Sequence, residues 1–214
     1  MHLLVMAKEP RPGRVKTRLC PPCTPEEAAE LAAAAIADTL DAVAACGADR
    51  RVVALDGEPG PWLPEGFEVI PQVDGPLGRR LDAAWAAVDG PGVQIGMDTP
   101  QVDGPLLDVA LGLLADGAPC VLGDATDGGW WAIGLQRAVP DLFGPVPTSR
   151  DDTGALQRER CRALGLEVTD LPALTDVDHV DDALEVARAA PDGLFGRTLA
   201  GLDLGGRATP DGSR

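Results

Sequence analysis

Hydrophobic positions along the chain form short continuous runs that alternate with longer segments of helical spacing. Residues 2–7 are the first short apolar run, which predicts a buried strand. Thr24 is a favourable N-cap, followed by Pro25 at the first helical position and Glu27 three residues after the cap. A helix is therefore predicted from there to Gly47. The later runs predict strands at 51–55, 67–71, 93–97, 119–123, 130–135 and 167–171. The later segments of helical spacing predict helices at 78–88, 105–115, 152–164 and 180–190.

This order of elements predicts the fold class. Strands that alternate with helices at such intervals build βαβ units, whose strands form a mostly parallel sheet. With 214 residues, the chain is long enough for one α/β domain with a substantial core. We place that domain at residues 1–190. Residues 191–214 are Gly-rich with little periodicity, and we expect them to form a partly disordered C-terminal tail.

Charge and cysteine content restrict the function classes. The formal net charge is −16 and the isoelectric point about 4.3, so nucleic acids and anionic membranes would be repelled and are not expected as partners. The apolar start has no basic flank, and the longest Ala-rich stretch, residues 31–37, is too short to span a bilayer. Five cysteines, an odd number, suit a cytoplasmic protein better than a disulfide framework. Cys20 and Cys23 form a CxxC pattern; either they belong to a turn before the helix or they serve redox or metal chemistry, and their role stays open.

Basic residues concentrate in one place despite this acidity. Five of the eighteen lie within residues 8–18, just after the first predicted strand: Lys8, Arg11, Arg14, Lys16 and Arg18. A Gly- and Pro-containing basic loop between a strand and a helix offers a diphosphate or triphosphate fixed cations and free backbone N–H groups. The alternative is a solvated basic loop without a ligand.

Two further loops follow predicted strands and carry chemically useful residues. Parallel sheets bind ligands at the carboxyl ends of their strands, which selects residues 98–100 and 123–129 together with the basic loop. Asp98 is a candidate Mg²⁺ or Mn²⁺ ligand, unless it only caps the helix that begins near Gly104. Asp176 and Asp178 share one face if their segment is extended, and Asp178 is a candidate partner for Asp98.

Residues 127–131, DGGWW, are the last candidate feature. Gly128 and Gly129 would let the backbone approach a ligand closely. Trp130 and Trp131 are adjacent in a predicted strand and therefore point to opposite faces. One of them could lie in the core and the other line an acceptor pocket, or both could serve packing alone.

These motifs resemble those of the bacterial DUF2064 family. These transferase-like proteins of the GT-A superfamily include the rSAM/selenodomain-associated transferases and are related to nucleotidyltransferases of the MobA and CofC kinds. The resemblance covers roughly residues 2–190. It rests on KEPRPGRVKTRL (8–19), GMDTP (96–100), DGGWWAIGL (127–135), LPALTDVD (171–178) and DAL (182–184). The chain departs from the family pattern at Trp130 and Trp131, which replace the usual aromatic residues, and at 147–149, where PTS replaces Trp-Gly/Ser-Thr.

The resemblance implies a single-domain, Rossmann-like GT-A fold that binds a nucleotide with Mg²⁺ or Mn²⁺. By motif match, Lys16 and Arg18 contact the phosphates, and Asp98 and Asp178 hold the metal. The nucleotide-binding set is Ala7, Lys8, Pro12, Gly13, Arg14, Lys16 and Arg18. The acceptor-binding set is Asp127, Gly128, Gly129 and Trp130. The catalytic set is Lys16, Arg18 and Asp98.

The leading hypothesis is a metal-dependent nucleotidyltransferase. It would transfer NMP from an NTP to a small anionic, phosphorylated acceptor and release pyrophosphate, with charge stabilisation and positioning as the main catalytic effects. The first alternative is a glycosyltransferase with a nucleotide-diphospho-sugar donor, and the second is a non-catalytic nucleotide-binding protein. The base, the acceptor and the choice between monomer and homodimer stay open.

Overall fold

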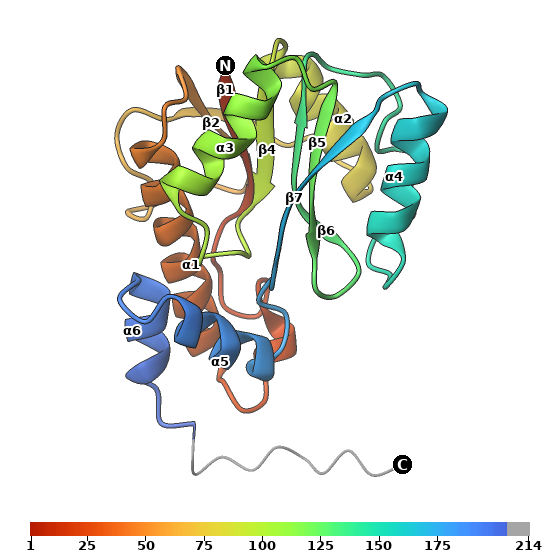
Figure 1. Ribbon diagram of the computed structural model, residues 1–214. Helices are drawn as coiled ribbons and strands as arrows, with labels where there is room; N and C mark the ends of the chain where they lie inside the picture. Colours follow the sequence, from red (N-terminus) through yellow and green to blue (C-terminus); the bar gives the residue numbers. More distant parts are fainter. Residues whose placement is uncertain (205–214) are drawn as a thin grey trace.

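Seven strands form one sheet in the order β3-β2-β1-β4-β6-β5-β7 (Figure 1). The structure is a computed structural model and describes residues 1–204. The strands are β1 (His2–Lys8), β2 (Arg50–Asp56), β3 (Glu68–Pro71), β4 (Gly92–Gly96), β5 (Cys120–Ala125), β6 (Trp130–Leu135) and β7 (Val168–Leu174). All neighbouring strands pair in parallel except β6, which is antiparallel to both β4 and β5. The predicted mostly parallel sheet is confirmed.

The short turn between β5 and β6 explains the antiparallel strand. Only four residues, 126–129, join the two strands, whereas a parallel crossover requires a dozen or more. Because β6 runs against its neighbours, its first residue, Trp130, lies at the sheet edge where β4 and β5 end. This turn therefore brings the DGGWW segment to the edge that holds the carboxyl ends of the parallel strands.

Helices cover both faces of the sheet. They are α1 (Pro25–Ala45), α2 (Leu77–Val88), α3 (Gly104–Ala115), α4 (Thr153–Ala163), α5 (Val180–Ala189) and α6 (Leu194–Ala200), with a 3₁₀ turn η1 (Thr17–Leu19). In the cores, α1 and α3 pack on one face and α2 and α4 on the other (Figure 1). The predicted cap of α1 is confirmed: Glu27 N donates to Thr24 Oγ1 at 3.2 Å, and Thr24 N donates to Glu27 Oε2 at 2.8 Å. No helix within the described residues is both long and apolar enough to cross a bilayer.

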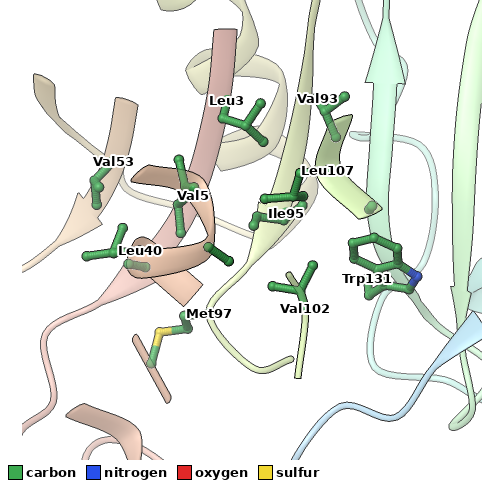
Figure 2. Close-up of a cluster of buried hydrophobic side chains, with 14 of the residues drawn as sticks. Leu3, Val5, Leu40, Val53, Val93, Ile95, Met97, Val102, Leu107 and Trp131 are labelled. Carbon is green, nitrogen blue, oxygen red and sulfur yellow. The ribbon is translucent and has the colours of Figure 1, made fainter. Parts of the chain in front are cut away.

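Alternate residues of the inner strands pack on opposite faces. Leu3 and Val5 point toward α1 and α3, where they meet Leu40, Ile95 and other fully buried side chains (Figure 2). Leu4 and Met6 point to the opposite core under α2. Burial on both faces explains why β1 is a continuous apolar run rather than an alternating one.

The C-terminal segment extends the packed structure beyond the predicted boundary at residue 190. Helix α6 lies inside the expected tail, and its Phe195 and Leu199 are buried against α1. The carboxylate of Asp38 accepts hydrogen bonds from Leu194 N at 2.8 Å and Phe195 N at 2.7 Å, which caps α6. A seven-residue helix gives too short a pattern to detect in sequence. The remainder of the predicted tail, residues 205–214, lies outside the described residues.

Candidate functional site

A cavity of about 710 Å³ lies at the sheet edge formed by the carboxyl ends of the parallel strands. Its volume is in the usual range for small-molecule sites, about 300–1,000 Å³. Acidic residues are abundant in its lining: Asp56, Asp98, Asp127, Asp151, Asp176, Asp178 and Asp182. The basic residues of the lining are Lys8, Arg18, Arg80 and Arg150. The three loops selected in the sequence analysis all contribute to this cavity.

Lys16 and Arg18 contact the two predicted metal ligands. Lys16 Nζ lies 2.5 Å from Asp98 Oδ1 and 4.0 Å from Asp178 Oδ1, and it also donates to the carbonyl of Val177. Arg18 Nη1 lies 2.5 Å from Asp178 Oδ2. The Lys16 side chain is only 7% exposed, so it is a buried counter-ion rather than a solvated surface lysine. The structure thus brings Lys16, Arg18, Asp98 and Asp178 together.

The backbone explains why these distant residues meet. Val177 N donates to the carbonyl of Asp98 at 2.9 Å, which ties the segment after β7 to the end of β4. Asp98 does not cap α3; that role belongs to Asp103, whose Oδ1 accepts from Leu106 N at 2.8 Å. The alternative that Asp98 serves only as a helix cap is therefore wrong.

Three carboxylates in this region have the arrangement of a metal site. Asp127, Asp176 and Asp178 each present an oxygen, and these oxygens lie within 4.8 Å of one another. Burial first, and then the charges of Asp127, Asp178 and Asp98, raise the pKa of Asp176 to about 6. Oδ1 of Asp176 is buried and has no hydrogen-bond partner among the described residues. Close oxygen donors with surplus negative charge fit Mg²⁺ or Mn²⁺.

This set differs from the predicted pair of ligands. Asp178 belongs to it, whereas Asp98 lies against Lys16 beside it. Asp127 was predicted on the acceptor side, and Asp176 was only a companion of Asp178. The Asp-X-Asp spacing at 176–178 was the signal for Asp176. No linear spacing relates Asp127 to this segment.

A second, smaller cavity of about 260 Å³ adjoins the basic loop. Lys8, Arg14, Lys16 and Arg18 line it, together with Asp98 and Asp178. Ala7, Lys8 and Arg18 line the larger cavity. Of the predicted nucleotide-binding set, Pro12 and Gly13 line neither cavity; Gly13 has a φ of 71° and shapes the turn. Arg11 pairs with Glu9 at 2.6 Å.

The two glycines of the DGGWW segment serve different purposes. Gly128 has a φ of +89°, and a Cβ added there would lie 1.9 Å from the carbonyl oxygen of Asp151. It therefore lets the β5–β6 turn pack against the loop before α4, and it does not line the cavity. Gly129 does line the cavity, and its N–H donates to Asp127 Oδ1 at 2.7 Å.

The two tryptophans point to opposite faces of β6, as predicted. Trp131 is 2% exposed, lies in the core under α1 and α3, and donates from Nε1 to the carbonyl of Pro172 at 2.9 Å (Figure 2). Trp130 lines the cavity, where its ring centroid lies 5.9 Å from that of Phe143. One tryptophan is therefore core and the other is cavity wall.

Sequence reasoning missed the wall formed by β2, β3 and α2. Arg80 Nη1 lies 2.8 Å from Asp56 Oδ2 and 3.3 Å from Gln72 Oε1, and its hydrogen bond is the main cause that lowers the pKa of Asp56. Gln72 Nε2 donates to the carbonyls of Ala7 and Ala54 at 2.9 and 2.8 Å. Asp56 and Gln72 end or follow parallel strands, so the strand-end rule could have found them. Arg80 is brought in by the packing of α2.

The loop before α4 completes the cavity. Thr148, Ser149, Arg150 and Asp151 line it. Arg150 makes a bidentate pair with Asp152, with distances of 2.7 and 2.8 Å. This is the segment where the chain departs from the family pattern, and the carbonyl of its Asp151 packs against Gly128 in the turn before Trp130.

Comparisons with known proteins agree with this geometry. Residues 29–150 match the family described as "Uncharacterized protein conserved in bacteria (DUF2064)". A protein from Desulfovibrio desulfuricans G20, provisionally assigned as a nucleotide-diphospho-sugar transferase, is 27% identical over 93% of both chains, with a TM-score of 0.83. The predicted GT-A type of fold is confirmed by this likeness. None of the proteins with curated functions matches the chain.

Two more distant structures share the fold. A nucleotidyl transferase from Methanothermobacter thermautotrophicus is 18% identical over 92% of this chain and 99% of its own, with a TM-score of 0.57. Rv0371c from Mycobacterium tuberculosis H37Rv, in a complex with manganese, is 18% identical over 86% of this chain and 97% of its own, with a TM-score of 0.53.

Proposed function

The chain belongs to the DUF2064 family, and we propose that it is a metal-dependent nucleotidyltransferase. It transfers a nucleoside monophosphate from an NTP to a small phosphorylated acceptor and releases pyrophosphate. The observation that carries this proposal is the contact of Lys16 and Arg18 with Asp98 and Asp178 at the junction of two cavities. Two solved structures that share the fold support it: the Methanothermobacter protein is named a nucleotidyl transferase, and the Desulfovibrio protein is provisionally assigned as a nucleotide-diphospho-sugar transferase.

The charges of the site require a divalent cation before a polyphosphate can bind. Lys16 and Arg18 offset Asp98 and Asp178, which leaves the charge of Asp127 and Asp176 without a basic partner among residues 1–204. An NTP entering this surplus negative charge would be repelled. Asp127, Asp176 and Asp178 would hold Mg²⁺ or Mn²⁺, and a bound ion would neutralise phosphate oxygens. The manganese complex of Rv0371c, on the same fold, supports a metal of this kind.

The basic loop supplies the cations for the phosphates. Lys16 and Arg18 line the smaller cavity with Lys8 and Arg14, so this cavity is the place for the β- and γ-phosphates and for the leaving pyrophosphate. An acceptor oxygen attacks the α-phosphorus in line, the new P–O bond forms, and the bond to pyrophosphate breaks. The protein stabilises the charge on the leaving group and positions both substrates, so it needs no covalent nucleophile.

The acceptor occupies the other side of the larger cavity. Trp130 and Gly129 line this side, together with residues 148–151 of the adjoining loop before α4. Arg150 is the cation of this side and is the candidate for an acceptor phosphate. Its bidentate contact with Asp152 fixes the orientation of its guanidinium group.

Glycosyl transfer is a second candidate function. The provisional assignment of the Desulfovibrio protein, at 27% identity over 93% of both chains, favours it. A nucleotide-diphospho-sugar leaves a nucleoside diphosphate, which carries less charge than the triphosphate donor and needs fewer cations. The four basic residues of the 8–18 loop that line the smaller cavity, Lys8, Arg14, Lys16 and Arg18, therefore favour the triphosphate.

The test is a thermal-shift panel of the four common NTPs, their NDPs and UDP-, GDP- and dTDP-sugars, each with Mg²⁺, with Mn²⁺ or with EDTA. Binding to the folded state raises Tm in proportion to ln(1 + [L]/Kd). A metal-dependent shift by an NTP is expected. A shift by nucleotide-sugars alone supports glycosyl transfer, and an NTP shift that survives EDTA contradicts the metal assignment. No shift by any ligand supports a non-catalytic protein.

A further inference from the structure

Gln94 is a buried amide in the lining of the larger cavity. It lies in the middle of β4, is 2% exposed, and lines the cavity. Its Oε1 is buried without a hydrogen-bond partner among the described residues, where its Nε2 makes no hydrogen bond either. Buried polar atoms in native proteins nearly always have a partner, so an amide without one needs an explanation.

Gln94 is a polar residue at an apolar position of the sheet. Its chain neighbours Val93 and Ile95 point to the opposite core, so Gln94 faces α2 and α4. Its partners in register are Leu4 on β1 and Ile133 on β6, and both belong to the apolar core on this face. A leucine or methionine would continue that core. A glutamine there makes no hydrogen bond within the described residues, so burying its amide costs folding free energy.

The surroundings of Gln94 form a compartment of the same cavity. Met6, Leu81, Phe143 and Trp130 line the cavity and pack in the same apolar core as Leu4 and Ile133, and Gln157 is a second buried amide of the lining, 1% exposed. Gln157 Nε2 donates to the carbonyl of Leu142 at 3.2 Å, so the orientation of Gln157 is fixed. Gln94 lies two residues before the end of β4, whereas Asp98 lies two residues after that end. Gln94 is therefore set back along β4 from the strand end at which the carboxylates lie.

We propose that Gln94 is a specificity-determining residue that binds a hydroxyl group on the body of the acceptor. A hydroxyl both donates and accepts, so it satisfies Oε1 and can also take a hydrogen bond from Nε2. An ionised phosphate has no proton for Oε1. An ammonium group would carry its charge into apolar surroundings. The acceptor is thus a phosphorylated, hydroxyl-bearing compound such as a sugar phosphate or polyol phosphate. This inference rests on the proposed function and specifies its acceptor.

The test compares wild-type protein with Gln94→Met, which keeps the side-chain volume and removes both polar atoms. Without ligand, the variant is expected to unfold at a Tm at least about 2 °C higher, because the unpartnered amide is gone. Gln72→Met is the matched control. The Gln72 amide donates to two carbonyls, so its loss is expected to lower Tm.

Ligand selectivity is the second readout. Calorimetry with Mg²⁺ compares glucose 1-phosphate, ribose 5-phosphate and glycerol 3-phosphate with cyclohexyl phosphate and inorganic phosphate. Wild-type protein is expected to bind at least one hydroxylated phosphate more tightly than cyclohexyl phosphate, and Gln94→Met to reduce that preference about tenfold. An unchanged preference in the variant, or no preference in wild-type protein, overturns the proposal.

Measuring NTP binding distinguishes a failure of this inference from a failure of the proposed function. Metal-dependent NTP binding by Gln94→Met is expected to equal that of wild-type protein. If the variant loses NTP affinity instead, Gln94 contacts the nucleotide and the inference is wrong, while nucleotidyl transfer stands. If wild-type protein binds no NTP, the proposed function itself fails.

Discussion

Lys16 combines features that rarely occur in one lysine. Its backbone has a φ of 48°, in the left-handed region, and its side chain is buried among two carboxylates and a carbonyl. A residue held in that conformation by its surroundings is often part of a functional site. Its ammonium group is therefore placed in advance for a ligand that brings its own negative charge.

Replacing Lys16 by Ala is expected to weaken NTP binding about 10- to 100-fold, because a charge-assisted hydrogen bond is lost. Nucleoside binding should change little. Arg11→Ala is the control, since Arg11 pairs with Glu9 and lines neither cavity. Calorimetry with the NTP and its nucleoside decides; equal losses for both ligands would refute the phosphate role.

Asp176→Asn tests the metal ligands. The folded-state pKa of Asp176 is about 6, above the 3.8 of an unperturbed Asp, so its ionisation costs stability as the pH rises through 6. In EDTA at pH 7.5 the variant should therefore have a higher Tm than wild-type protein. Its Mn²⁺ affinity should fall at least roughly tenfold in calorimetry, because a ligand charge is lost. Asp151→Asn, which lines the same cavity but lies outside the cluster, should retain Mn²⁺ affinity.

At the scale of elements, the tight contact between the β5–β6 turn and the loop before α4 holds the cavity wall together. Gly154 N donates to the carbonyl of Gly128 at 2.8 Å, and a Cβ at Gly154 would lie 2.5 Å from the carbonyl of Gly129. The two backbones touch without intervening side chains. Glycine is needed here for packing between elements rather than for a ligand.

Gly128→Ala is expected to destabilise the fold by more than about 2 kcal/mol, since it adds a clash with the Asp151 carbonyl to an unfavourable positive φ. Gly13→Ala has the same sign of φ with open space around its Cβ, so about 1 kcal/mol is expected. Urea unfolding measures both. Similar losses for the two variants would mean that the backbone contact is not as tight as described.

Helix α6 depends on a side chain from α1. Asp38→Ala leaves the N–H groups of Leu194 and Phe195 without their acceptor and should cost about 1 kcal/mol, a typical loss for a helix cap. Asp41→Ala, on the exposed side of α1, should leave stability within about 0.5 kcal/mol. Urea unfolding again measures the difference; equal stability of both variants would show that the cap contributes nothing.

At the scale of the whole molecule, a buried histidine couples stability to pH. His2 is 2% exposed in β1, with its ring centroid 5.2 Å from that of Trp85, and burial is the main cause that lowers its pKa to about 4. The unfolded chain binds this proton near pH 6.5, while the folded protein does not. Stability is therefore fully present above pH 6.5 and is lost as the pH falls toward 4.

His2→Phe should remove this pH dependence. Between pH 7 and pH 5 the histidine contributes a loss on the order of 2 kcal/mol, or several degrees of Tm. The difference in Tm between variant and wild-type protein, recorded in EDTA across this range, isolates His2 from the opposite effect of Asp176. A constant difference would show that His2 does not titrate on unfolding.

Sequence patterns were sufficient for the elements and for the edge that carries the site. Apolar runs, the Thr24 cap and the strand–helix alternation depend on local spacing, and the strand-end rule needs only the order of elements. Local patterns do not show which carboxylates form the candidate metal site. Asp127 joins Asp176 and Asp178 only because the short β5–β6 turn makes β6 antiparallel and because Val177, after β7, donates a hydrogen bond to Asp98, after β4.

The sequence by itself determined the α/β class, the basic loop and the strand-end carboxylates, because each rests on neighbours within a few positions. The tertiary structure alone decided that Lys16 is buried against Asp98, that Gly128 serves packing, and that Gln94 meets the cavity rather than a protein partner. Burial, clashes and unsatisfied hydrogen bonds are relations between segments far apart in the chain. Such relations exist only once the segments are packed together.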